Sequence, residues 1–209
     1  MLPREFFARH PLVCAVELIG CQLVWEHGSG VIVETEAYTA LGDEACHTFL
    51  RRGAQKFVDA HPAGTAYIYL NYGIHWLVNV LIKGGGMDGF VLIRALEPRL
   101  GQDAMRERRK LQDPRQLCSG PGKLTQALGI PAAFHGSSLC HDPRHAFHAA
   151  ENGQPPPAIV QDVRIGISRA AELPWRFLVA GNRHVSKAPT RAARPLDLPG
   201  LLAAQKGPD

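Results

Sequence analysis

The chain lacks any stretch that would cross a membrane or direct export. Of its 209 residues 45% are apolar, yet no run reaches the about 18 consecutive apolar residues that a spanning helix needs. Its first residues, Met-Leu-Pro-Arg-Glu-Phe-Phe-Ala-Arg, are charged and contain no apolar core of a secretory signal. We therefore expect an intracellular protein that works away from membranes.

Cysteine is scarce, and its spacing excludes a disulfide framework or a zinc ribbon. The chain has an odd number of cysteines and no C-x-x-C pair among them: Cys14, Cys21, Cys46, Cys118 and Cys140. This pattern predicts free thiols in a reducing compartment.

The chain also lacks a strong net charge. Its net charge of +4 and pI of 8.9 do not by themselves indicate a nucleic-acid binder. The basic residues are nevertheless uneven: seven lie between Arg99 and Lys123 and eight more from Arg164 to the end, whereas acids concentrate around 34–44. Carboxylates in cationic surroundings are typical of chemistry on a polyanion. A solvated charged helix face is the alternative, and for 103–112 alone it is the favoured one.

Residues 31–38, Val-Ile-Val-Glu-Thr-Glu-Ala-Tyr, carry the most information. Strand residues two apart share a face, so Glu34, Glu36 and Tyr38 should project together, and His47 follows nine residues later. Paired carboxylates beside a cleft suit a general base that activates water. The alternative is an edge strand whose solvated glutamates each pair with an arginine.

Two β-rich runs around Asn71-Tyr72-Gly73 predict a hairpin. Its tip exposes Tyr72, and Tyr67 and Tyr69 share one face of the leading strand. Proteins that deform DNA insert such a side chain between base steps. The alternative places Tyr72 back against the sheet and the strand tyrosines in the core.

The remaining pattern predicts an α+β fold with a largely antiparallel sheet, because strands come as meanders and helices separately. Helices are expected at 11–19, 99–112 and 123–128, and strands at 21–25, 31–38, 65–70, 74–82, 90–96, 160–168 and 175–179. A turn at 27–30 should join the first two strands, and 48–63 and 135–157 should be irregular. We expect one compact domain over 1–194 and a loosely held tail over 195–209.

Several motifs together resemble the alkyladenine (3-methylpurine) DNA glycosylases, in the same order and over roughly residues 2–180. They are Glu34-Thr-Glu-Ala-Tyr38, His47, Gly64-Thr-Ala-Tyr-Ile-Tyr-Leu-Asn-Tyr-Gly73, Asn79, Leu92-Ile-Arg-Ala-Leu-Glu-Pro98 and Cys118-Ser-Gly-Pro-Gly-Lys-Leu124. The resemblance implies a single domain on a curved antiparallel sheet with flanking helices and a protruding hairpin that enters the DNA minor groove. It also implies cofactor-free hydrolysis of the N-glycosidic bond of alkylated or deaminated purines, in base excision repair.

Carried over position by position, the resemblance assigns each residue a role. Glu36 would activate water, and Arg94 would orient that water and Glu36. Tyr72 would fill the gap left by the flipped nucleotide. Tyr38, His47 and Tyr69 would enclose the base, and Asn79 would exclude guanine by collision with its amine. The simpler readings are that Arg94 is only an ion-pair partner, Asn79 satisfies a strand end and His47 is a surface residue.

The expected partners are double-stranded DNA and a damaged purine base, met by a monomer. Ser119 precedes the short helix expected at 123–128, and Lys123 is its first residue. Both are weak candidates to hold a DNA phosphate. The G-x-x-x-x-G-K spacing of a nucleotide-binding loop is missing. No lysine or N-terminal proline is placed to form a Schiff base, so we predict a glycosylase without lyase activity. The competing hypothesis is a protein on the same scaffold that binds damaged DNA without hydrolysis.

Two further features bear on the site. Cys140, His141, His145 and His148 lie close in sequence, but Pro143 interrupts the spacing of a zinc site, so we predict no metal. The family usually carries a Thr-Pro-Arg-Asn-like segment before the hairpin, where this chain has Arg51-Arg-Gly-Ala-Gln-Lys-Phe-Val58.

Overall fold

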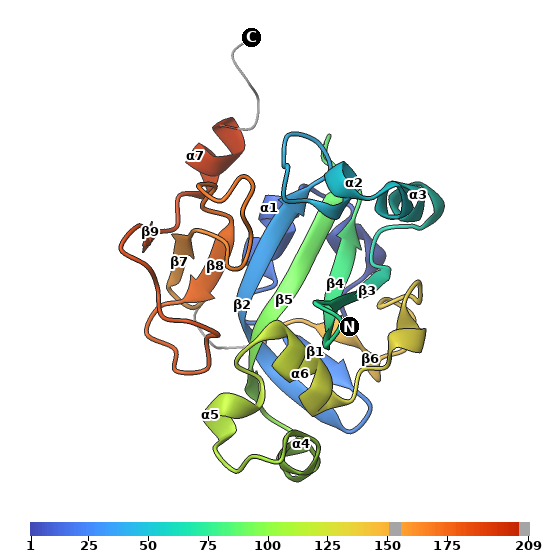
Figure 1. The fold of residues 1–209 in the computed structure, drawn as a ribbon, viewed down its shortest axis with the longest axis vertical. Helices are drawn as coiled ribbons and strands as arrows, with labels where there is room; N and C mark the ends of the chain where they lie inside the picture. The colour runs from blue at the N-terminus through green and yellow to red at the C-terminus, as the bar shows by residue number, and fades with distance from the viewer. Residues whose placement is uncertain (151–155, 205–209) are drawn as a thin grey trace.

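The computed structural model describes residues 1–150 and 156–204, and it has the predicted α+β architecture (Figure 1). Within these residues nine strands form one sheet in which every paired neighbour is antiparallel. The strands are β1 (Gln22–Trp25), β2 (Gly28–Thr39), β3 (Ala66–Asn71), β4 (His75–Ile82), β5 (Gly89–Pro98), β6 (His145–His148), β7 (Ile159–Asp162), β8 (Arg176–Val179) and β9 (Arg194–Pro195). Their order is β3-β4-β5-β2-β8-β7-β9, and β1 pairs with both β2 and β6.

Alternation along the central strands separates two faces of this sheet. One face buries Ala37, Val80, Val91 and Ile93 in the main hydrophobic core, against helix α1 (Pro11–Glu17). Pro11 fits the first turn of that helix, where a proline loses no hydrogen bond. On this face the Thr35 hydroxyl donates to the carbonyl of Ala15 at 2.8 Å. The opposite face therefore receives the polar and aromatic side chains of the same strands.

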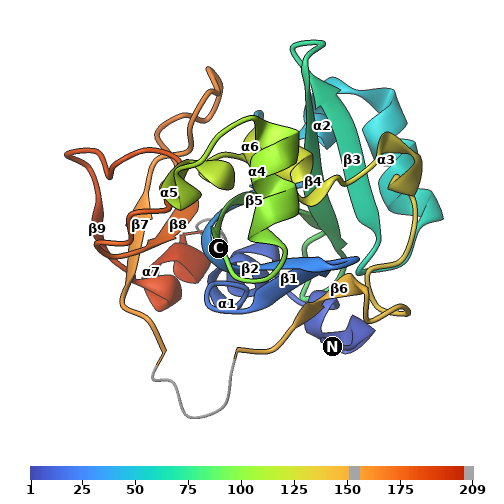
Figure 2. The ribbon, with the colours of Figure 1, turned by 90° about the horizontal axis from the view of Figure 1, so that it is seen from below.

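The other helices surround the sheet (Figures 1 and 2). They are η1 (Arg4–Phe7), α2 (His47–Leu50), α3 (Arg52–Ala60), α4 (Gln102–Arg109), α5 (Pro114–Leu117), α6 (Pro121–Leu128), η2 (Ala132–Phe134) and α7 (Leu198–Ala203). Helix α6 packs on β4 and β5, and α4 packs on α6. Among the described residues, none of the helices has the length and apolar content required to span a bilayer.

Helices α2 and α3 correct the prediction that residues 48–63 are irregular. Ala54, Phe57 and Val58 follow the i, i+3, i+4 spacing of an amphipathic helix, and all three are buried. They form a second, smaller apolar cluster with Tyr67 and Phe90 on the polar face of the sheet. These helices are short and contain several charged residues, so the apolar spacing was too brief to predict a helix from the sequence.

Other boundaries also differ from the prediction, and the strand expected at 160–168 ends at Asp162. Strand β2 begins at Gly28 and Trp25 pairs with Gly28, so the turn from β1 is Glu26-His27 and not 27–30. Strand β6 lies inside the segment 135–157 that we expected to be irregular, of which 151–155 fall outside the described residues. β6 forms because its backbone groups pair with those of β1, a distant strand. A local sequence pattern does not reveal such a pairing.

The segment expected as a loose tail from 195 contains ordered elements up to 203. Arg194–Pro195 pairs with β7, and α7 buries Leu201 against the main core beside α1. Asp197 caps this helix by accepting from the Gly200 N–H. Residues 205–209 of the expected tail lie outside the described residues.

Candidate active site

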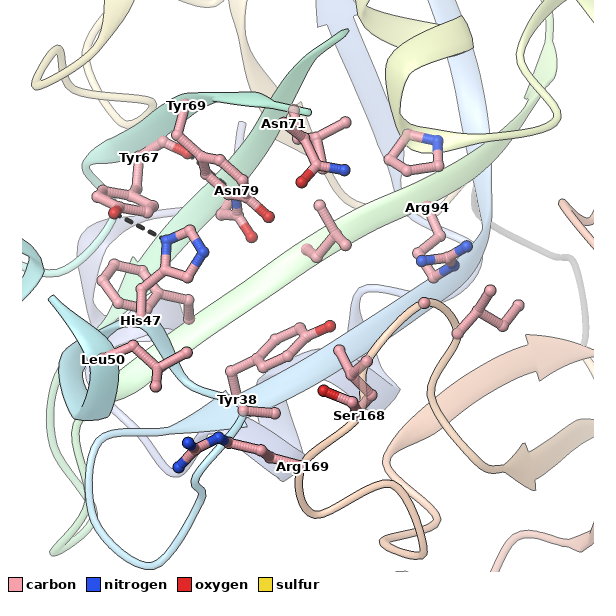
Figure 3. Close-up of a pocket in the computed structure, with 18 of the residues that line it drawn as sticks. Tyr38, His47, Leu50, Tyr67, Tyr69, Asn71, Asn79, Arg94, Ser168 and Arg169 are labelled. Atoms are coloured by element: carbon pink, nitrogen blue, oxygen red, sulfur yellow. Dashed lines mark hydrogen bonds between the residues drawn. The ribbon is translucent and has the colours of Figure 1, made fainter. Parts of the chain in front are cut away.

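A cavity of about 390 Å³ lies on the polar face of the sheet, a size typical of small-ligand sites (Figure 3). It is bounded by β2, by the β3–β4 hairpin, by the start of α2 and by the segment 165–169. Six of the sequence-predicted residues line it: Tyr38, His47, Tyr69, Tyr72, Asn79 and Arg94. The sheet alternation brings them together, because each strand contributes the residues that face away from the main core.

Aromatic rings form one side of the cavity. The His47 ring lies 4.3 Å from the Tyr69 ring and 5.8 Å from the Tyr67 ring, between centroids. Its Nδ1 is hydrogen-bonded to the Tyr67 hydroxyl at 3.0 Å, so His47 is no free surface residue. These contacts hold His47 although residues 51–58 stand in place of the Thr-Pro-Arg-Asn-like segment that the resemblance leads one to expect. Tyr67 is buried against Phe57 and Phe90, as the core alternative expected for it.

Burial sets the protonation of these rings. Burial, and then the nearby charge of Arg51, lowers the pKa of His47 to about 4, so the imidazole is neutral at pH 7. Burial, with Tyr67 and Glu36 nearby, raises the pKa of Tyr69 to about 12. The cavity therefore presents neutral aromatic faces at neutral pH.

Asn79 lies in the middle of β4 and is nearly fully buried. Its side-chain amide donates to the carbonyl of Tyr67, the residue directly opposite on β3, at 3.1 Å. Asn79 therefore does not satisfy a strand end. It is held rigidly on the floor of the cavity next to Leu92, its neighbour across β4 and β5.

Behind Arg94, which lines the cavity, lies a buried set of charges. Glu34, Glu36, Arg94 and Arg176 make up this set, which is called the ion-pair wall below. Arg94 donates through Nη1 to Glu36 at 3.2 Å and through Nε to Glu34 at 3.3 Å. Burial opposes its charge, but Glu36 and Glu34 outweigh that cost and raise the pKa of Arg94. The glutamates are paired with arginines, as the alternative reading expected, but they are buried on a central strand and not solvated on an edge.

Glu34 and Glu36 differ in how many donors they accept from. Glu34 accepts from Arg94, from Arg176 at 2.7 Å and from both the N–H and the hydroxyl of Ser186. Four donors use the lone-pair sites of a carboxylate, so Glu34 is a saturated counter-ion. Glu36 accepts from Tyr38, Arg94 and the Ile165 N–H, which leaves one site on Oε1.

We expected Glu36 to face the cleft, whereas its carboxylate lies one side chain behind the cavity wall. It is 0% exposed and does not line the cavity; Tyr38, Arg94 and Ile165, which hold it, do. The Tyr38 hydroxyl donates to Oε2 at 2.8 Å. Burial, and then Glu36, raises the pKa of Tyr38 well above its usual value, so this hydroxyl keeps its proton.

Two buried arginines support this wall, and the sequence reasoning missed both. Arg176 is fully buried and also donates to Asp162 at 3.0 Å. Arg164 forms a bidentate pair with Asp43, at 2.6 and 2.8 Å, with its guanidinium 4.6 Å from the Tyr38 ring centroid. Asp43 and Arg164 are far apart in sequence, as are Glu34 and Arg176, so only the tertiary fold brings these partners together.

The hairpin tip, residues 71–74, is the exposed part of the site, and it protrudes from the body of the protein (Figure 2). Tyr72 is 81% exposed and Ile74 is 71% exposed, so Tyr72 does not fold back onto the sheet. Both central residues have positive φ, 51° at Tyr72 and 70° at Gly73, and the Ile74 N–H closes the turn on Asn71. A bulky residue rarely adopts this left-handed conformation.

The weaker candidates lie outside the cavity. Lys123 Nζ approaches the Ser119 hydroxyl at 3.4 Å beside the start of α6, whose Pro121 does line the cavity. The four residues around Pro143 have separate contacts: Cys140 with Gly64, His141 with Arg4, His145 with Glu26, and His148 with the Pro143 carbonyl. Within the described residues no group of three or more His, Cys, Asp or Glu is arranged to hold a metal. All five cysteines are free thiols, as predicted.

Comparison with known proteins gives a consistent result. The family model described as methylpurine-DNA glycosylase matches residues 5–183. A protein of Rhodopseudomonas palustris strain HaA2 is 50% identical over 185 residues, which cover 88% of this chain and 90% of that protein. One of Methanoculleus marisnigri is 44% identical over 190 residues (89% and 98%), and one of Chlorobaculum tepidum is 42% identical over 191 residues (89% and 90%). All three are provisionally named 3-methyladenine DNA glycosylase.

Proposed function

Because this chain belongs to the methylpurine-DNA glycosylase family, we propose that it is a monofunctional DNA glycosylase. It flips an alkylated or deaminated purine out of duplex DNA, hydrolyses the N-glycosyl bond with an activated water and leaves an abasic site. The observation that carries the proposal is one cavity lined by aromatic rings and by Arg94, which is bonded to the Glu36 carboxylate directly behind the cavity wall.

The aromatic side suits a flipped purine. Tyr38, His47 and Tyr69 offer ring faces, and stacking is indifferent to which lesion is held. A neutral His47 avoids repulsion of a purine that alkylation at N3 or N7 has made cationic. Asn79, held by Tyr67, is a fixed obstacle that collides with the exocyclic amine of guanine.

The charged side suits the chemistry. As the C1′–N bond breaks, the base leaves with the electron pair and the sugar becomes oxocarbenium-like. Water then forms the new C1′–O bond, and its proton passes to Glu36. Negative charge at Glu36 stabilises the cationic sugar, and Arg94 keeps that carboxylate oriented. A cationic lesion is already a good leaving group, so no strong general acid is needed.

The burial of Glu36 adds a requirement. Water reaches its carboxylate only when a neighbour gives way, and Tyr38, whose hydroxyl donates to Glu36, lines the cavity (Figure 3). We infer that the entering base turns the Tyr38 ring and releases one lone pair on Oε2 for water. Apo sites commonly have catalytic contacts that rearrange only in the substrate complex.

DNA contacts follow from the same assignment. Tyr72 at the hairpin tip enters the minor groove and fills the gap of the flipped nucleotide, which offsets the cost of unstacking. The amides at the start of α6, with Lys123 and Ser119, hold a backbone phosphate. No lysine is among the residues that line the cavity in the described part of the chain, in keeping with hydrolysis without a Schiff base. The protein acts as a monomer in a reducing compartment.

The burial of Glu36 also favours a second candidate, a protein that binds damaged DNA and flips bases without hydrolysis. The two differ in one measurement. Duplexes containing 3-methyladenine or hypoxanthine are incubated with the protein and then treated with alkali, which cuts at abasic sites. Cleavage supports the glycosylase, and tight binding without cleavage supports the second candidate.

Replacement of the proposed base is the sharper test. Glu36→Gln should bind lesion duplex but lose about 10²- to 10⁴-fold in excision rate, the usual contribution of a general base. Glu17→Gln, at an exposed glutamate on α1, is the control and should excise at the wild-type rate. Normal turnover by Glu36→Gln would refute its role.

A further inference from the structure

The segment that follows β8 contacts the ion-pair wall and does not line the cavity. From 182 to 190 it has no regular structure, yet it contacts the buried charges at three points. Ser186 contacts Glu34 and Arg94, the Lys187 carbonyl accepts from Arg176, and Thr190 contacts Asp162. An irregular segment with this many bonds to buried charges has a defined position.

Ser186 is hydrogen-bonded to two oppositely charged residues of the wall, Glu34 and Arg94. Its N–H and its hydroxyl both donate to Glu34, the latter at 2.8 Å, and its Oγ accepts from Arg94 Nη2 at 3.3 Å. A hydroxyl has one donor and two acceptor sites, so these bonds are compatible. Ser186 therefore links the two partners that lie behind Glu36.

Arg94 is held at three nitrogens, each by a different residue. Nε is bonded to Glu34, Nη1 to Glu36 and Nη2 to Ser186. The guanidinium is a rigid planar fork, so two of these bonds fix the direction of the third. Without the Ser186 hydroxyl, Nη2 loses its partner and Glu34 loses a donor. The aim of Nη1 at Glu36 then depends on one bond at 3.3 Å.

We propose that Ser186 is a positioning residue for the reaction: its hydroxyl sets the Arg94 guanidinium against the Glu36 carboxylate. This inference rests on the proposed glycosylase function for its effect on rate. The serine does not line the cavity, so it acts through Arg94, which it contacts directly and through Glu34.

The same segment provides a matched control. Thr190 also donates its N–H and its hydroxyl to one buried carboxylate, that of Asp162. Asp162 in turn is bonded to Arg176, but no bond joins Thr190 to Arg94. Removal of either hydroxyl therefore disturbs the same network, but only Ser186 disturbs Arg94 directly.

The test compares Ser186→Ala, Ser186→Thr and Thr190→Ala in single-turnover excision at saturating enzyme, with duplex affinity and urea unfolding measured alongside. Ser186→Ala should lower the rate roughly 10- to 100-fold, the scale of a misplaced catalytic group, at unchanged affinity. Ser186→Thr keeps the hydroxyl and should recover most of the rate, and Thr190→Ala should excise at the wild-type rate. Equal rate losses in the two alanine variants, following their losses of stability, would overturn the proposal.

Crystal structures of the two alanine variants decide the same point without activity. In Thr190→Ala the Arg94 Nη1 to Glu36 Oε2 distance should stay near the 3.2 Å of the parent protein, and in Ser186→Ala it should lengthen beyond hydrogen-bond range. An unmoved Arg94 in Ser186→Ala overturns the inference. If the parent protein releases no base from any lesion, the proposed function fails, and these structures still decide whether Ser186 positions Arg94.

Discussion

The ion-pair wall and the hairpin tip contrast in how they are held. In the ion-pair wall, Glu34, Glu36 and Arg176 are fully buried, and each is bonded to at least two partners. At the hairpin tip, Tyr72 and Ile74 are exposed, with strained backbone at Tyr72. The charges of the wall are paired within the protein, whereas the aromatic side chain at the tip is largely exposed.

This contrast shows where each kind of work is placed. A group that must hold reacting atoms needs neighbours that are already fixed, and buried ionic networks provide them at a desolvation cost. A group that inserts between bases needs to be free until DNA arrives, so its packing energy comes from the ligand. The wall should therefore fail through stability, and the tip through binding.

The largest effect should come from the centre of the wall. Arg176→Ala leaves two buried carboxylates, Glu34 and Asp162, without their shared partner, which we expect to cost about 3–5 kcal/mol of unfolding free energy. Urea unfolding at pH 7 measures it. The control is Arg144→Ala, which removes an exposed pair with Asp142 and should leave the unfolding free energy nearly unchanged. A loss below about 1 kcal/mol in Arg176→Ala would show that the wall is not essential to the fold.

The hairpin tip should show the opposite sign in stability. Tyr72→Asn suits the left-handed conformation, so it should raise the unfolding free energy by up to about 1 kcal/mol. It removes the inserted ring, which should weaken binding to lesion duplex by about 1–3 kcal/mol, roughly 10- to 100-fold. Tyr72→Phe keeps the ring and should change neither quantity. The contrast fails if the asparagine variant binds duplex as tightly as the parent protein.

The division between wall and tip also separates what the sequence reveals from what it does not. Alternation predicts that Glu34, Glu36 and Tyr38 share a face, and the Tyr38 and Arg94 bonds confirm it. The hairpin and its exposed tip also follow from the local pattern, because two runs of strand-forming residues flank a short turn that contains Asn and Gly.

The support behind the wall does not follow from local pattern. Arg176 meets Glu34 across 142 positions, and Ser186 meets it across 152. The Arg176 contact depends on the register of β8 on β2, and Ser186 lies in the segment that follows β8. Burial of Glu36 depends on Ile165, another distant residue. Long-range pairing decides these contacts, and a single sequence carries no signal for it.

The smallest effect concerns His47, which belongs to the aromatic side of the cavity. Its pKa is about 4 in the folded protein and near the ordinary 6.5 in the unfolded chain, because burial and Arg51 disfavour its charge. Between about pH 6.5 and pH 4, His47 therefore binds a proton in the unfolded chain but stays neutral in the folded protein. The stability present above pH 6.5 is lost as the pH falls toward 4, and no further loss comes from this group below that.

His47→Gln removes this group, so the unfolding free energy of the variant should fall less steeply with acid. Urea unfolding at intervals from pH 4.5 to pH 7.5 measures the two slopes. The difference between parent and variant should shrink as the pH falls, since only the parent is penalised. Some slope should remain in the variant, because burial also lowers the pKa values of His10, His135 and His184. A difference that stays constant over the whole range would mean that His47 titrates alike in both states, and so that the cavity does not shield it from water.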